Sequence, residues 1–169
     1  MIRIINNFFE ENIFEEVTSY IKNNLFFTPR YFEDSTEKTN ENFYGNRFCL
    51  NEDKNLLNTF IKQSEKKFNI KIKKVHHDCG IDLRNLSKFQ PHVDNIEGIE
   101  LNVLIMLEGP IGVTTGTVFY TDKELDIHVG FRPNRAVLFP SDYYHCAHQS
   151  DLQNLKRYTA SLFIQEYEL

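Results

Sequence analysis

The sequence predicts a mainly β protein with N-terminal helices, in the α+β class. Two amphipathic segments come first, and about eight short segments of β character follow, separated by glycine, proline, asparagine and aspartate. A run of strands after a run of helices is typical of an antiparallel sandwich or barrel with helices packed on one face. The 169 residues suit one domain, with helical support over about 1–68 and the barrel over about 70–165.

Apolar residues recur every three or four positions in 7–24 and in 54–68, which predicts two helices. The predicted strands are approximately 70–76, 80–89, 99–107, 116–121, 125–130, 135–139, 143–148 and 157–164. The segment 101–107 is almost wholly apolar, as in a strand buried on both faces. Residues 28–47 have no sustained period. We expect them to form a mobile lid over the substrate, with 43–47 supplying aromatics and an arginine; an ordinary surface loop is the alternative.

The composition disfavours some classes of protein. With 19 basic and 24 acidic residues, the net charge is −5 and no basic face is evident, which disfavours nucleic-acid binding. The cysteines Cys49, Cys79 and Cys146 have no CxxC spacing, which favours a reducing compartment. No apolar run approaches the ~20 residues that cross a bilayer, and the N-terminus does not resemble a signal peptide. We therefore expect a cytoplasmic protein without membrane contact.

His92 and Asp94 are the first candidate metal ligands. In an extended strand, side chains two positions apart point to the same face. An imidazole and a carboxylate so placed can reach one cation at ~2.0–2.2 Å each. A third ligand must come from elsewhere, and the candidates are His145 and His148. Two histidines and one carboxylate on one side of an iron make the facial triad of non-heme Fe(II) oxygenases.

A candidate anion site lies near the C-terminus. Arg157, Thr159 and Ser161 share one face of a predicted strand. An arginine on the inward face of a barrel is costly unless it pairs with an anion. A dicarboxylate ligand would supply that anion through a bidentate contact.

These residues resemble the iron- and 2-oxoglutarate-dependent dioxygenases, in particular the small prolyl 4-hydroxylase-like members. The resemblance covers about 80–164, roughly half of the chain. The segments that carry it are His92-Val93-Asp94, Thr115-Gly116-Thr117-Val118-Phe119-Tyr120, the Phe139-Pro140-Ser141 turn that leads to His145, and Arg157-Tyr158-Thr159.

The resemblance implies a double-stranded β-helix, which is a jelly-roll or cupin-like barrel. His92, Asp94 and His145 would hold Fe(II) and act as the catalytic residues, and 2-oxoglutarate would chelate the metal. Arg157 would bind the distal carboxylate of 2-oxoglutarate with help from the Thr159 hydroxyl. The implied activity uses O2 to hydroxylate a peptide side chain, an amino acid or a small metabolite, and the resemblance allows ascorbate as a further cofactor.

The choice of third ligand stays open at this point. Arg157 follows His145 by twelve positions and His148 by nine, and the spacing typical of the family lies between the two. We favour His145 because the Phe-Pro-Ser approach to it matches the family pattern. The two histidines are three positions apart and would face opposite sides of a regular strand, so both cannot easily be ligands.

Other residues have weaker claims to a role. Asn102 follows the His92–Asp94 pair and is a candidate for hydrogen bonding to cofactor or substrate inside the barrel. The 76–78 segment, His-His-Asp, could bind metal, but adjacent strand residues point to opposite faces. We expect His128 to be solvated and Cys146 to be a buried thiol that faces away from the metal.

Two functions compete with the oxygenase. A cupin-like metal-binding protein would use the same barrel, but typically with more histidines in H-x-H spacing and a nearby glutamate. A catalytically degenerate oxygenase fold would keep the barrel as a binding module, although the complete set of His92, Asp94, His145 and Arg157 argues against such a loss. A zinc hydrolase is disfavoured because no carboxylate is placed as its general base.

Overall fold

The computed structural model describes residues 1–31, 43–85, 91–94, 96, 98–112, 114–122, 124–148 and 156–169. Two helices, α1 (Glu11–Asn24) and α2 (Lys54–Phe68), occur with a short 3-10 helix at Leu50–Glu52. The strands are β1 (Arg3–Asn6), β2 (Thr28–Tyr31), β3 (Phe43–Cys49), β4 (Lys71–Val75), β5 (Gly80–Asn85), β6 (Leu101–Glu108), β7 (Gly116–Thr121), β8 (Glu124–Gly130), β9 (Arg135–Pro140), β10 (His145–Ala147) and β11 (Lys156–Glu168). No helix in these ranges is long and apolar enough to cross a membrane.

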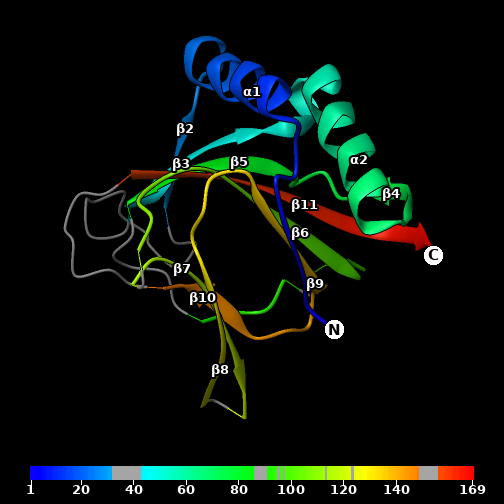
Figure 1. The fold of residues 1–169 in the computed structure, drawn as a ribbon, viewed down its shortest axis with the longest axis vertical. Coiled ribbons are helices and arrows are strands. Elements are labelled where there is room, and N and C mark those ends of the chain that lie inside the picture. The colour runs from blue at the N-terminus through cyan, green and yellow to red at the C-terminus, as the bar shows by residue number, and fades with distance from the viewer. Residues whose placement is uncertain are drawn as a thin grey trace.

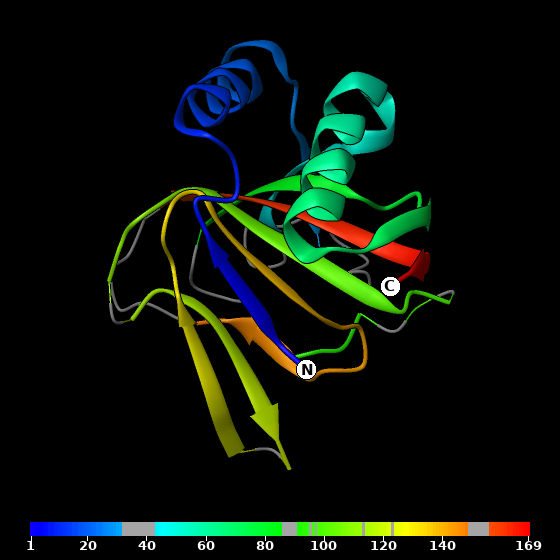
Figure 2. The same ribbon diagram turned by 45° about the vertical axis from the view of Figure 1, so that its right-hand side comes forward.

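The strands form two antiparallel sheets. The larger has eight strands in the order β1-β9-β6-β11-β5-β3-β2, with β4 also paired to β11, and the smaller has the order β10-β7-β8. Both helices cover one face of the large sheet, and the small sheet lies on its other side (Figures 1 and 2). The predicted class, mainly β with helices on one face, is confirmed. The predicted closed barrel fits loosely, because in the described ranges no strand ladder joins the two sheets.

Strand β6 lies between two apolar cores, as its almost wholly apolar sequence predicted. Val103 and Ile105 face the helices in the larger core, whereas Met106 faces the small sheet. The second core also contains Phe119, Val129, Phe131, Val137 and Phe139. Because side chains alternate along a strand, Asn102 of β6 and Thr117 of β7 lie on the same side of their strands as the second-core residues Met106 and Phe119.

The two helices lie near their predicted positions. Helix α2 begins after Asp53, whose carboxylate accepts hydrogen bonds from the backbone N–H groups of Asn55 and Leu56. Helix α1 begins at residue 11, four residues later than residue 7, the first of the predicted range. The cause is a turn at Asn7 with φ 52°, after which the Phe9 backbone pairs with the side chain of Asn134 instead of continuing a helix.

The prediction of a lid over residues 28–47 is wrong for both ends of that segment. Residues 28–31 form β2 and residues 43–49 form β3, and β3 pairs with β5 inside the large sheet. Residues 32–42 lie outside the described part of the chain. Arg47, expected to reach the substrate from a mobile loop, instead binds the Asp82 carboxylate of the neighbouring strand.

Candidate metal centre

His92, Asp94 and His145 come together on the side of the large sheet that faces the small one. His92 lies between β5 and β6 and forms an isolated bridge with His145 of β10. In that bridge each backbone N–H donates to the other residue's carbonyl at 2.9 Å. The backbone N–H of Asp94 donates to the Ser141 carbonyl at 2.8 Å. These contacts hold two segments that are far apart in the sequence side by side.

The three side chains converge on one point. Asp94 Oδ1 lies 3.5 Å from His92 Nε2, and Asp94 Oδ2 lies 3.4 Å from His145 Nε2. One ligand atom from each residue lies within 4.8 Å of the others. Atoms at these separations can each lie ~2.0–2.2 Å from a shared cation. The geometry therefore suits a three-ligand metal site with the remaining coordination positions open.

His145 is set up to offer a neutral nitrogen to a metal. It is 6 % exposed, and its Nδ1 lies 2.9 Å from the Tyr143 carbonyl, an arrangement in which Nδ1–H donates. The lone pair is then on Nε2, toward Asp94. Burial lowers the pKa of His145, and the charges of His92 and Arg84 act in the same direction, whereas Asp94 opposes them. A neutral imidazole is the form that binds metal.

Asn102 contacts the carboxylate of this cluster. Its Nδ2 donates to Asp94 Oδ2 at 2.5 Å, and its buried Oδ1 has no hydrogen-bond partner among the described residues. The sequence predicts that Asn102 could hydrogen-bond to a cofactor or substrate, and in the structure its side-chain amide donates to the candidate metal ligand Asp94. A hydrogen bond of this kind fixes the orientation of a ligating carboxylate.

We expect Asn102→Leu to weaken binding of Fe(II) or Mn(II) by about 10- to 100-fold, because Asp94 would lose the donor that orients it. The measurement is an anaerobic metal titration of the two proteins. Thr117→Val is the matched control, since Thr117 lines the same pocket and its buried hydroxyl has no partner in the described chain. An unchanged affinity in Asn102→Leu would contradict the assigned role.

A polar pocket runs from these three side chains to Arg157. Its empty volume is about 440 Å³, part of it open to solvent. The lining residues are Asp82, Arg84, His92, Asp94, Asn102, Leu104, Thr117, Phe139, His145, Ala147, Arg157, Thr159, Ser161 and Phe163. Arg157, Thr159 and Ser161 share this side of β11, as their two-residue spacing predicted. The three candidate ligands and the candidate anion site thus belong to one cavity.

Arg157 is a buried cation. Its Nη1 donates to the Gly116 carbonyl at 2.8 Å, and its buried Nε has no hydrogen-bond partner among the described residues. Burial lowers the pKa of Arg157 to about 9, so the guanidinium is still charged at neutral pH. A buried charge with an unused donor is costly unless an anion binds it. The site therefore fits a ligand that carries a carboxylate.

The structure separates the two histidines left open by the sequence. His145 faces Asp94, whereas the His148 ring lies against His128, with ring centroids 4.8 Å apart. The turn at 149–155, which determines the spacing to Arg157, lies outside the described residues. Cys146 points to the other side of β10, where its Sγ lies 3.5 Å from the hydroxyl of Tyr120.

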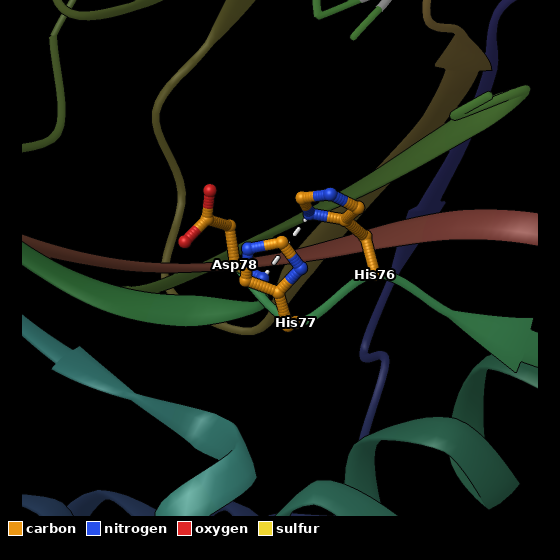
Figure 3. A group of neighbouring side chains, drawn as sticks. All are labelled: His76, His77 and Asp78. Atoms are coloured by element: carbon orange, nitrogen blue, oxygen red, sulfur yellow. Dashed lines mark hydrogen bonds between the residues drawn. The ribbon is translucent and has the colours of Figure 1, made fainter. Parts of the chain in front are cut away.

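A second group of possible metal ligands is His76, His77 and Asp78, drawn in Figure 3. Strand alternation had argued against it, but residues 76–79 form the connection between β4 and β5, where alternation does not apply. One ligand atom from each residue lies within 4.8 Å of the others. However, Nδ1 of the buried His76 lies 3.2 Å from the backbone nitrogen of Asp78 and accepts a hydrogen bond from its N–H group, so this ring nitrogen is already used within the segment.

Sequence reasoning missed two charged residues that line the pocket. Asp82 and Arg84 line it from β5, and Arg47 of β3 binds Asp82. The available signal was the alternation of Ile81 and Leu83 with Asp82 and Arg84, which marks one polar face of a strand. Because the aperiodic sequence of 28–47 predicts a loop, it offers no neighbouring strand as a partner for that polar face.

The sequence matches no family model, and no curated protein matches it. Several solved structures are similar in fold. A 2OG-Fe(II) oxygenase family oxidoreductase from Burkholderia pseudomallei has a TM-score of 0.68 at 12% identity, covering 99% of this chain and 85% of that one. A Pseudomonas putida prolyl-4-hydroxylase has a TM-score of 0.67 at 9% identity, and the match covers 98% of this chain and 92% of that one.

The non-heme alpha ketoglutarate-dependent epimerase SnoN from nogalamycin biosynthesis has a TM-score of 0.65 at 8% identity, covering 97% of this chain and 77% of that one. A second SnoN structure holds Fe3+, alpha ketoglutarate and nogalamycin RO. Identities this low establish similarity of fold. The chain has the fold of the 2-oxoglutarate- and Fe(II)-dependent oxygenases.

Proposed function

We propose that this protein is an Fe(II)- and 2-oxoglutarate-dependent oxygenase. The observation that carries the proposal is that one pocket contains both a His-Asp-His cluster and a buried arginine with an unused donor. His92, Asp94 and His145 would hold Fe(II). Arg157, assisted by Thr159, would bind the distal carboxylate of 2-oxoglutarate. Bound iron would supply O2 activation coupled to the oxidation of 2-oxoglutarate.

The chain's own residues would orient and shield this chemistry. Asn102 would hold the Asp94 carboxylate in place, and the Tyr143 carbonyl would keep the His145 ring in the tautomer that presents Nε2. The Phe139 ring packs against the His145 ring, with centroids 4.8 Å apart, and would exclude water from one side of the metal. These contacts leave the ligand atoms facing the pocket.

The proposed reaction is hydroxylation of a peptide side chain, an amino acid or a small metabolite. The fold is shared with a prolyl-4-hydroxylase and with an epimerase, so the hydroxylase outcome is part of the proposal. The acidic balance of the chain supports a substrate other than nucleic acid. The alternatives are a cupin-like metal-binding protein and an oxygenase fold that binds without turnover.

Succinate production tests the proposal directly. We expect the wild-type protein, given Fe(II), 2-oxoglutarate and O2, to form succinate slowly even without its substrate, and Asp94→Ala to form none. Added ascorbate should prolong the reaction if iron oxidises during uncoupled turnover. Metal binding without 2-oxoglutarate binding would instead favour the cupin-like alternative. Binding of both without succinate, at any ascorbate concentration, would favour the degenerate oxygenase fold.

A further inference from the structure

Two arginines face each other across neighbouring strands in the pocket. Arg84 of β5 is the direct cross-strand partner of Arg157 of β11, and both line the cavity. Side chains at such positions have Cβ atoms only about 4.5–5.5 Å apart. Like charges placed directly opposite each other destabilise a sheet. An anion between the two guanidinium groups would remove this repulsion.

The charge of Arg84 acts on Arg157. After burial, which is the largest cause, Arg84 is the next cause that lowers the pKa of Arg157, and Asp82 opposes it. Arg84 also lines the same pocket as the candidate metal ligands, so it belongs to the site that contains the candidate anion site.

Asp82 holds Arg84 in this position. The Asp82 side chain is buried, and Arg47 Nη1 donates to its two oxygens at 3.0 and 2.8 Å. Arg84 Nη2 donates to Oδ2 at 3.2 Å, the longest of these three contacts. A Cβ at Gly80 would lie 2.5 Å from Arg47 Nε, so the glycine makes room for the Arg47 side chain. Asp82 is thus shared between two arginines, and its shortest contacts are with Arg47.

We propose that Arg84 and Arg157 form a two-arginine clamp for the distal carboxylate of 2-oxoglutarate, with Asp82 as the residue that positions Arg84. The assignment rests on the proposed function. A carboxylate has two oxygens and about four acceptor sites, which suits two guanidinium groups approaching from adjacent strands. The clamp makes the pocket selective for 2-oxo acids with a second carboxylate over those without one.

Calorimetry on the full chain, loaded with Mn(II) without O2, tests the clamp with two probes. One is 2-oxoglutarate, and the other is pyruvate, which keeps the 2-oxo acid group but lacks the distal carboxylate. We expect Arg84→Gln to weaken 2-oxoglutarate binding at least tenfold and to leave pyruvate binding unchanged. Arg84→Lys should recover part of the affinity. The matched control is Arg132→Gln, which removes the same charge from an exposed position outside the pocket lining.

The other outcomes overturn the assignment. Equal losses of affinity for both probes would place Arg84 at the metal end of the pocket. No loss of affinity for either probe would mean that Arg84 contacts the substrate or only stabilises the sheet. If Arg84→Gln does not fold, as judged by circular dichroism, Arg84→Lys decides by the same comparison of probes. If the wild type binds neither Mn(II) nor 2-oxoglutarate, the proposed function fails. Glutarate, which needs no metal, then tests the clamp alone. If the wild type binds glutarate and the Arg84 variant does not, the clamp is supported. If the wild type does not bind glutarate, the clamp is overturned.

Discussion

Replacing Asp94 with alanine is expected to lower the affinity for Fe(II) or Mn(II) by more than about 100-fold. Loss of a partner that only orients a ligand costs 10- to 100-fold, and Asp94 is the carboxylate that both His92 and His145 face. Its removal would leave only the two imidazoles of His92 and His145 to hold a divalent ion. The loss of metal affinity is measured by an anaerobic calorimetric titration, and circular dichroism checks that the variant folds.

The histidine variants locate the third ligand in the same titration. His145→Ala should lose metal affinity as strongly as Asp94→Ala, because its Nε2 lies 3.4 Å from the Asp94 carboxylate. His148→Ala is the matched control and should bind normally, since its ring packs against His128. Normal binding in His145→Ala together with loss in His148→Ala would move the third ligand and contradict the geometry.

Replacing Arg157 with alanine is expected to weaken 2-oxoglutarate binding to the metal-loaded protein at least about tenfold. A charge-assisted, bidentate contact contributes about 1.5–3 kcal/mol, and each 1.4 kcal/mol corresponds to a factor of ten. Arg157 is 3 % exposed, so water would not replace the lost contact well. Calorimetry with Mn(II) in the absence of O2 gives the affinity without turnover.

Two further variants separate charge from geometry at this position. Arg157→Lys restores the charge but not the planar pair of donors, and should recover only part of the affinity. Arg132→Ala removes a positive charge from an exposed position and should bind 2-oxoglutarate as the wild type does. If the metal-loaded wild type shows no 2-oxoglutarate binding at all, the oxygenase proposal fails and the cupin-like alternative gains.

The elements with strong hydrophobic periodicity could be predicted from the sequence. Helix α2 occupies its predicted range, and β6 is buried on both sides, as its continuous apolar run indicated. Strand β2 was missed because its first three residues are exposed, so no alternation of apolar residues marks it. Its membership of the sheet comes from pairing with β3, which joins β5 in turn. The single-domain organisation stays a prediction.

The candidate site could be predicted only in part, because some of its residues meet through long-range strand pairing. The two-residue spacing of His92 and Asp94 predicted that they act together, but in the structure they lie outside the named strands, and backbone hydrogen bonds to His145 and Ser141 hold them in place. Arg157 stood out because a charge within an apolar strand requires a partner. The meeting of Arg84 with Arg157 depends on the register between β5 and β11, whose paired residues are more than 70 positions apart in the chain. Local patterns contain no information about that register.

By itself, the sequence determined the two helices and the order of the strands from β4 onward, and it predicted that His92 acts with Asp94 and that Arg157 needs an anion. These follow from periodicity and from the cost of burying charge, which are local properties. Only the tertiary structure showed that His145 lies beside Asp94 and that His148 lies against His128, and only it placed Arg84 opposite Arg157. Both outcomes depend on hydrogen bonding between distant segments, the His92–His145 bridge and the β5–β11 ladder, whose registers are chosen by the packing of the whole sheet.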